Sequence, residues 1–166
     1  MAKLGQQRGF SLIELLIVVA VILVIAAIAI PNMLRAHMAA NEASAVASIR
    51  ALGTAETTYA NTYPEYGFTC NIGDMGPPAG SGLATSNAAG LIDAGLASGY
   101  KAGYTFAFTN CVAGGSSTVN ATFQSTATPV SIGQSGVRAF CSDQGGAVRY
   151  DAGGSSSTCL GSGSPL

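Results

Sequence analysis

The sequence predicts an α+β protein in which a long N-terminal helix packs against a small antiparallel β-sheet. Two observations support this fold class. Residues 15–30 contain no polar or charged side chain, whereas the chain after residue 60 is rich in Gly, Ser, Thr and Asn. The later region also contains short stretches of alternating apolar and polar residues, which are typical of half-buried strands. A chain of 166 residues is long enough for one domain and one membrane segment.

The apolar segment is long enough to cross a membrane. Residues 10–30 number 21, and as a helix they would span about 31 Å, close to the hydrocarbon thickness of a bilayer. Lys3 and Arg8 precede them, which predicts a single-pass protein with a cytoplasmic N-terminus. An ordinary secretory signal would have a shorter apolar region and a clear small-residue cleavage site. Residues 26–29 offer only a weak site of that kind.

Low charge argues against nucleic acid as a required partner. Charged residues make up 9% of the chain, and the formal net charge is −1. Phosphate binding needs a basic face. The basic residues after the apolar segment are instead scattered along the sequence: Arg35, Arg50, Lys101, Arg138 and Arg149.

One acidic residue interrupts the start of the apolar segment. An ionised carboxylate inside a membrane is costly, so such residues are rare and usually have a partner. Glu14 occupies this position, four residues after Phe10. A plain membrane anchor does not require it, unless the side chain simply reaches water at the cytoplasmic interface.

The segment from Gly9 through Phe10-Ser11-Leu12-Ile13-Glu14 to Ala29-Ile30-Pro31-Asn32 resembles the signature of type IV pilins. The resemblance covers the N-terminus and about the first third of the chain. It implies the pilin fold, and it implies that residues 1–9 are a leader removed by a prepilin peptidase between Gly9 and Phe10. It further implies that Phe10 is N-methylated and that Glu14 pairs with the N-terminal amine of a neighbouring subunit.

The resemblance implies a structural function and no enzymatic activity or cofactor. The expected protein is a type IV pilus subunit that forms a helical homo-oligomer with the help of an assembly machinery. It would reside in the inner membrane before assembly and in the extracellular pilus afterwards. A pseudopilin of the type II secretion system shares this N-terminus and is the alternative. A membrane-anchored enzyme or binding module is a further alternative, but it leaves the Gly9–Phe10 junction unexplained, and the sequence shows no catalytic motif.

The helix is expected in two parts. Residues 10–31 would form the transmembrane and filament-core helix, ending at a kink at Pro31, and residues 32–63 a stem that packs on the sheet. Apolar residues of the stem recur at three, four or seven positions and form one stripe: Leu34, Met38, Ala45, Ile49, Leu52, Tyr59 and Tyr63. Four charged residues are expected to lie largely off that stripe: Arg35, Glu42, Arg50 and Glu56.

Residues 64–166 are expected to form a loop followed by three or four antiparallel strands and a disulfide-bonded C-terminal region. Strands are predicted around 104–109, 118–123, 137–141 and 147–150, with a hairpin turn at 143–146. A short helix is predicted within 88–97. The tail at 153–166 is rich in Gly and Ser, and only Cys159 is expected to hold it.

The cysteines predict disulfides and not a metal site. All four lie beyond the apolar segment without close Cys or His neighbours: Cys70, Cys111, Cys141 and Cys159. They allow three connectivities. The pairs Cys70–Cys111 and Cys141–Cys159 close the shorter loops and are favoured. Asp143 and Asp151 could ligate calcium, but turn capping is the expected role. Asn120 begins an N-glycosylation sequon, a triplet that is common by chance.

Overall fold

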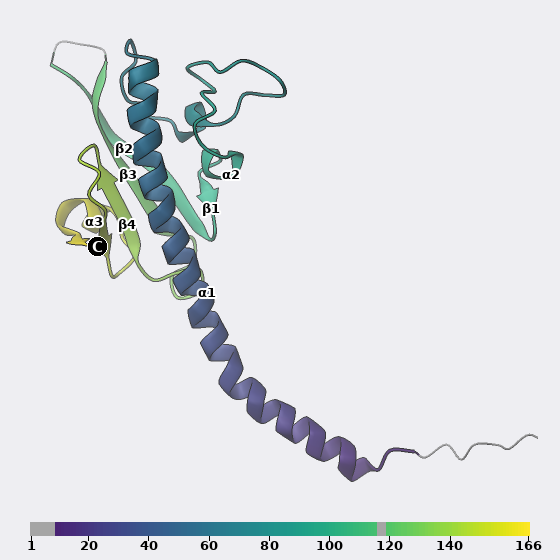
Figure 1. The fold of residues 1–166 in the computed structure, drawn as a ribbon. Coiled ribbons are helices and arrows are strands. Elements are labelled where there is room, and N and C mark those ends of the chain that lie inside the picture. The colour runs from purple at the N-terminus through teal and green to yellow at the C-terminus, as the bar shows by residue number, and fades with distance from the viewer. Residues whose placement is uncertain (1–8, 116–118) are drawn as a thin grey trace, which may run out of the picture. The chain divides into compact units, whose positions relative to one another are not determined.

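The computed structural model describes residues 9–115 and 119–166. The predicted leader, residues 1–9, therefore lies outside the described residues except for Gly9. The backbone divides into two compact units, the first ending at Ala36 and the second spanning His37–Leu166. The long helix α1 (Leu12–Thr62) belongs to both units and is coloured from purple to blue-teal in Figure 1.

In the first unit, α1 exposes apolar side chains all round. From Leu12 to Leu34, its large apolar side chains are between 48% and 79% exposed. Helical structure continues through Pro31, which lies inside α1. Because proline has no N–H, the carbonyl of Ala27 lacks its usual helical donor there. The kink predicted at Pro31 stays a prediction.

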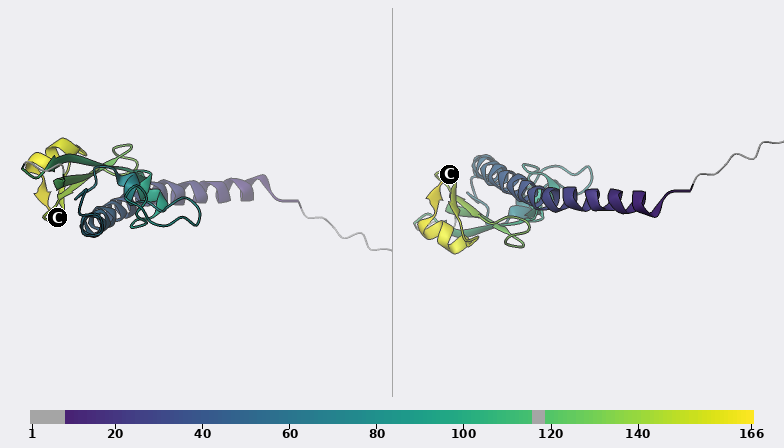
Figure 2. Two further views of the ribbon diagram at one scale, coloured as in Figure 1. Left: turned by 90° about the horizontal axis from the view of Figure 1, so that it is seen from above. Right: turned by 90° about the horizontal axis from the view of Figure 1, so that it is seen from below.

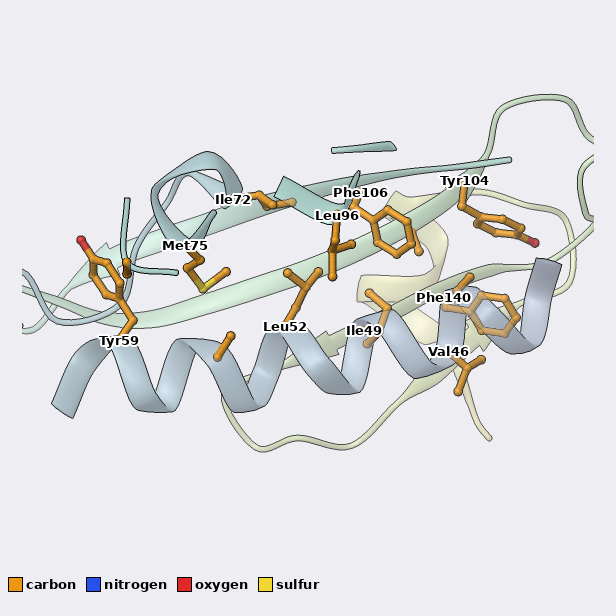
Figure 3. Packing of buried hydrophobic residues seen from close by; sticks show 14 residues of the cluster. Val46, Ile49, Leu52, Tyr59, Ile72, Met75, Leu96, Tyr104, Phe106 and Phe140 are labelled. Carbon is orange, nitrogen blue, oxygen red and sulfur yellow. The ribbon is translucent and has the colours of Figure 1, made fainter. Parts of the chain in front are cut away.

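In the second unit, one face of α1 is buried. Figure 3 shows Val46, Ile49, Leu52 and Tyr59 directed from the helix into the core. They meet apolar side chains from the strands and from the segment that follows α1: Ile72, Met75, Leu96, Tyr104, Phe106 and Phe140. The predicted stripe is therefore buried from Ala45 to Tyr59, while Leu34 is exposed.

The sheet has six strands in the order β1-β2-β3-β4-β5-β6, and every neighbouring pair is antiparallel. The predicted α+β fold class, a long N-terminal helix with a small antiparallel sheet, is confirmed. Figure 1 shows the central strands lying beside the stem. The bounds are β1 Tyr100–Lys101, β2 Tyr104–Ala113, β3 Asn120–Pro129, β4 Ala139–Asp143, β5 Arg149–Asp151 and β6 Ser164–Pro165.

The segment between α1 and the sheet is mostly irregular. It contains a 3-10 helix, η1 (Ile72–Met75), and the short helix α2 (Ala94–Ala97). The helix predicted within 88–97 is confined to its last four residues. The residues before it instead bond to η1, because Ala89 N–H donates to the Asp74 carbonyl at 2.7 Å. Asp93 then caps α2 by accepting from the Leu96 N–H at 3.0 Å.

The C-terminal tail is more ordered than its composition suggested, so the prediction that only Cys159 holds it is wrong. Helix α3 (Ser156–Ser162) is capped by Ser155, whose hydroxyl accepts a hydrogen bond from the Thr158 N–H. Strand β6 then pairs with β5, and Leu166 N–H donates to the Val148 carbonyl at 3.2 Å. Figure 2 shows these yellow elements at one side of the sheet.

Two disulfides link the irregular segments to the sheet. Cys70 pairs with Cys111, and Cys141 pairs with Cys159, with Cα–Cα distances of 5.9 and 6.0 Å. These are the pairs that close the shorter loops. The first fastens the segment after α1 to β2, and the second fastens α3 to β4.

Candidate functional site

The first turn of α1 contains one of the two hydrogen bonds of a capping box, the bond from the N-cap N–H to the third helical residue. The helix begins at Leu12, so Ser11 is the N-cap residue and Glu14 the third residue of the helix. The Glu14 carboxylate accepts a hydrogen bond from the Ser11 backbone N–H at 3.0 Å. The Leu15 N–H donates to the Ser11 carbonyl at 3.3 Å. Sequence reasoning missed this role, although Ser-x-x-Glu before an apolar run is its signal.

The carboxylate is therefore held beside the residue that follows Gly9. Phe10 directly precedes the N-cap and is 91% exposed. The N-terminus of a helix also favours a negative charge, because its free N–H groups carry partial positive charge. Glu14 thus has a local reason to sit at the start of α1. The Ser11 bond uses one of its two oxygens, and a carboxylate has further acceptor sites.

The helix around this carboxylate is a candidate membrane span. Its most apolar window of 18 residues has a mean hydropathy of 3.3. Between residues 9 and 34, Glu14 is the only charged side chain. Length and composition allow this helix to cross a bilayer. The same surface could be covered by other apolar helices.

In the second unit, Glu42 fastens the stem to the loop between β3 and β4. Its Oε1 accepts from the backbone N–H groups of Val137 at 2.9 Å and Arg138 at 3.1 Å. Its Oε2 accepts from Arg138 Nε at 2.8 Å and Nη2 at 2.7 Å. Burial alone would raise the pKa of Glu42, but these N–H groups and the guanidinium hold it below its ordinary value.

Two aromatic rings support the Arg138 guanidinium. Its central carbon lies 5.4 Å from the ring centroid of Phe140 and 5.4 Å from that of Tyr150. Cation–π contacts of this kind hold the guanidinium in place. The prediction that Glu42 lies largely off the buried stripe is wrong, because the residue is only 9% exposed.

Replacing Glu42 with Ala should lower the free energy of unfolding by about 2 to 3 kcal/mol, because two backbone N–H groups and a guanidinium lose their acceptor. Urea denaturation of the full chain in detergent would measure this. Glu65→Ala is the control, since Glu65 is exposed, and it should change stability by less than about 0.5 kcal/mol. Equal effects of the two substitutions would contradict the anchoring role.

Glu56 is the second carboxylate of the stem that lies inside the core, and its predicted position off the stripe is also wrong. The residue is 0% exposed. Its Oε2 accepts from the Thr69 N–H at 3.0 Å, whereas its Oε1 has no hydrogen-bond partner among the described residues. Burial, with a smaller contribution from the negative charge of Asp74, raises the pKa of Glu56 to about 8. The side chain is therefore mainly neutral at pH 7.

The remaining acidic candidates serve the backbone. Asp143 accepts from the Gly145 N–H at 2.9 Å and pairs with Arg149 at 3.0 Å. Asp151 accepts from the N–H groups of Gly153 at 3.0 Å and Ser155 at 2.8 Å. Both side chains thus cap turns. In the described residues, no group of three or more His, Cys, Asp or Glu side chains could hold a metal ion.

The amide of Asn120, the first residue of the sequon, is also occupied. Its Nδ2 donates to the Phe68 carbonyl at 3.0 Å and contacts the Cys70 sulfur at 3.3 Å. The backbone of Asn120 bonds to the same segment, donating to the Tyr66 carbonyl and accepting from the Phe68 N–H. Asn120 therefore holds the segment after α1 against β3.

Comparisons with known proteins agree with the geometry of the first turn. Residues 4–30 match a family model described as the prokaryotic N-terminal methylation motif. The chain is also 38% identical over 87 residues to the type IV major pilin protein PilA of Myxococcus xanthus (strain DK1622). Over that stretch, the chain is similar to a type IV pilin. The match covers 51% of this chain but only 40% of the length of that pilin. No solved structure matches the chain.

The matched motif includes Gly9, Phe10 and Glu14 and ends just before Pro31. The structure places Glu14 in the first turn of α1 and Phe10 two residues before that helix, and it places the four cysteines in the other unit.

Proposed function

We propose that this chain is the precursor of a filament subunit, cut between Gly9 and Phe10, methylated at Phe10 and polymerised through α1. The observation that carries this proposal is that α1 is apolar all round from Leu12 to Leu34, and that Glu14, the single charge of this stretch, lies four residues after Phe10. No soluble surface requires that combination.

The apolar surface of the helix must be shielded from water both before and after assembly. Its large side chains are exposed from Leu12 to Leu34, and leaving such a surface in water is unfavourable. The inner membrane covers it in the precursor, with the N-terminus in the cytoplasm. In the filament, the corresponding helices of neighbouring copies take the place of the lipid. The subunit thus passes from membrane to extracellular filament without exposing the helix to water.

Cleavage creates a partner for Glu14. It leaves an ammonium group at Phe10 and removes the basic residues Lys3 and Arg8, which could not enter an apolar core. In the filament, the ammonium of one copy pairs with the Glu14 carboxylate of a neighbour. Each ion alone would cost several kcal/mol to bury, so the pairing penalises misaligned copies more than it adds stability. The capping bond from Ser11 occupies only one carboxylate oxygen, so both interactions can coexist.

This function requires a prepilin peptidase for cleavage and methylation, and an assembly machinery that lifts subunits out of the membrane. A pseudopilin of the type II secretion system would use the same first turn. The two differ in the fate of the filament, because a pilus extends from the cell surface.

The intact mass of the protein sheared from cells tests the proposal. We expect a chain that begins at N-methylated Phe10, recovered from filaments visible by electron microscopy. The same processed mass confined to the membrane fraction would indicate a pseudopilin. An uncut chain, or one cleaved after residues 26–29, would overturn the proposal.

A further inference from the structure

The two disulfides of the second unit differ in their access to solvent. Cys141 and Cys159 are both 0% exposed, so their disulfide lies in the protein interior. In the other pair, Cys70 is exposed and Cys111 is half-buried. Thiol–disulfide exchange requires a thiolate to reach one of the two sulfur atoms. Cys70–Cys111 is therefore the disulfide that a reductant can reach in the folded protein.

Two surface cavities give access to one side of this disulfide. Cys70 lines both of them, and Cys111 lines neither. Their volumes are about 430 Å³ and 260 Å³. The larger cavity is also lined by Glu65 and Asp74, whose negative charges repel an approaching thiolate. The described residues that line the smaller cavity carry no charge. Attack is therefore expected at the Cys70 sulfur, from the smaller cavity.

The residue before Cys70 covers a buried carboxyl of the stem. The Thr69 N–H donates to Glu56 Oε2 at 3.0 Å, and it is the one hydrogen-bond partner that the described residues give this carboxyl. Thr69 is 5% exposed and Glu56 is 0% exposed. The position of the backbone at Thr69 and Cys70 thus decides whether water reaches Glu56.

The parts of the fold beside this segment differ in how firmly they are held. Ile72 and Met75, which follow it, are 6% and 0% exposed and belong to the apolar core. The end of β2, which carries the partner cysteine, is irregular, with register shifts between Thr109 and Ala113. Loss of the cross-link would therefore loosen the backbone around Cys70 and the end of β2, while the core holds the rest of the fold.

We propose that Cys70–Cys111 is a reducible latch, and that its reduction by a dithiol opens the segment over Glu56 while the rest of the second unit stays folded. The hydrogen bonds between Asn120 and this segment remain after reduction. Such bonds open and close reversibly, whereas the disulfide holds the segment permanently. Once the segment is open, water reaches Glu56 and its carboxyl can ionise. Reduction and proton release are thereby coupled.

The exchange proceeds in two steps. A thiolate of the reductant attacks the Cys70 sulfur, so that a mixed disulfide forms, the bond to Cys111 breaks, and the Cys111 thiolate takes a proton. The second thiol of the reductant loses its proton and attacks the reductant's own sulfur in the mixed disulfide, which releases Cys70 as a thiolate that is protonated in turn. Two electrons pass to the protein, and the reductant leaves as an internal disulfide. Asn120 Nδ2, 3.3 Å from the Cys70 sulfur, supports the departing thiolate.

Two titratable groups interact with Glu56 in the closed state. Asp74 lies between the core residues of η1, and its negative charge opposes ionisation of Glu56. Tyr59 lies on α1, and its hydroxyl donates to the Ser86 carbonyl at 2.7 Å. Both groups belong to parts that stay packed, so the effect of opening comes from water. Hydration then lowers the pKa of Glu56 from about 8 toward its ordinary value.

The order of reduction tests the latch in the wild-type protein. The full chain in detergent is incubated with dithiothreitol, free thiols are blocked with iodoacetamide after increasing times, and the labelled peptides are measured by mass spectrometry. Cys70 and Cys111 should be labelled at least about tenfold faster than Cys141 and Cys159. With 2-mercaptoethanol in place of the dithiol, the trapped mixed disulfide should lie on Cys70. Equal rates for the two disulfides, or a mixed disulfide on Cys111, would overturn the proposal.

A variant without the cross-link tests the opening itself. In Cys70→Ser/Cys111→Ser, the backbone amides of residues 66–70 should exchange with deuterium at least about tenfold faster than in wild type, while β4 is unchanged. Adding Glu56→Gln to both proteins isolates the contribution of this carboxyl to the pH dependence of urea unfolding. That contribution should shrink by at least about half without the disulfide. A variant that does not fold, or that matches wild type in both measurements, would contradict the latch.

Discussion

Replacing Glu14 with Ala or with Gln should reduce filament yield by at least about tenfold, while the protein still inserts in the membrane. In a filament core, either substitution leaves the ammonium of Phe10 buried without its counter-charge, and an unpaired buried ion costs several kcal/mol. Insertion depends on the apolar side chains of α1, which neither substitution changes.

The pair of substitutions separates charge pairing from helix capping. The Ser11 N–H donates to Glu14 at 3.0 Å, and Gln can accept the same bond, because a capping box uses Glu or Gln. Ala loses the cap, which is worth about 1 kcal/mol. If capping were the whole role of Glu14, the Gln variant would assemble normally.

The measurement is the amount of subunit in the sheared fraction relative to the membrane fraction, by immunoblot, together with electron microscopy of the cells. Ser11→Ala is the control, because it removes the N-cap hydroxyl and leaves the Glu14 carboxylate and the Ser11 backbone N–H in place. It should assemble at close to the wild-type level. Normal filaments from both Glu14 variants would refute the pairing with Phe10.

The second unit should lose stability as the pH rises from about 5 to 8, because of Glu56. Burial raises the pKa of this carboxyl from 4.5 to about 8. Between these values, the folded protein holds a proton that the unfolded chain has released, so raising the pH favours unfolding. The contribution is fully present below pH 4.5 and is lost as the pH approaches 8.

The size of this effect follows from linkage. Each unit of pKa difference corresponds to about 1.4 kcal/mol, so the full loss is on the order of 5 kcal/mol. Urea denaturation of the full chain in detergent at several pH values would measure it. The groups that act on this carboxyl are the Thr69 N–H and Asp74. The negative charge of Asp74 opposes ionisation of Glu56.

Glu56→Gln is the matched variant, because its side chain has nearly the same shape and accepts the Thr69 bond without titrating. The difference between wild type and variant should shift steadily in favour of the variant as the pH rises. A parallel pH dependence of the two proteins would show that Glu56 is charged in the folded state, contrary to its environment in the core.

The long helix and the central strands could be predicted because their patterns repeat. The alternation at Tyr104, Phe106 and Phe108 marked β2, and the hairpin at 143–146 was placed where β4 ends at Asp143. The length of β3, which runs to Pro129, was missed, since its second half is rich in Ser, Thr and Ala. These small residues carry a weak apolar signal, and the neighbouring strands determine that they pair.

The helix and the apolar stripe of the stem could be predicted, but the burial of two of its carboxylates could not. Glu42 and Glu56 are separated by fourteen residues, four helical turns, so they share the face that carries Ile49. Because both residues are polar, the sequence predicts instead that they lie off the buried stripe. What permits their burial is a set of backbone N–H groups in loops far along the chain, at Thr69 and Val137. The sequence around each Glu contains no sign of those donors.

The two disulfides give the second unit a particular mechanical property. Residues joined by a covalent cross-link cannot separate under force, so the stretches enclosed by Cys70–Cys111 and Cys141–Cys159, with sequence separations of 41 and 18, cannot lengthen. Fully extended, these stretches would span about 140 Å and 60 Å. A subunit pulled along its chain would therefore lengthen only outside these two loops, in helix α1 and in the residues between the loops.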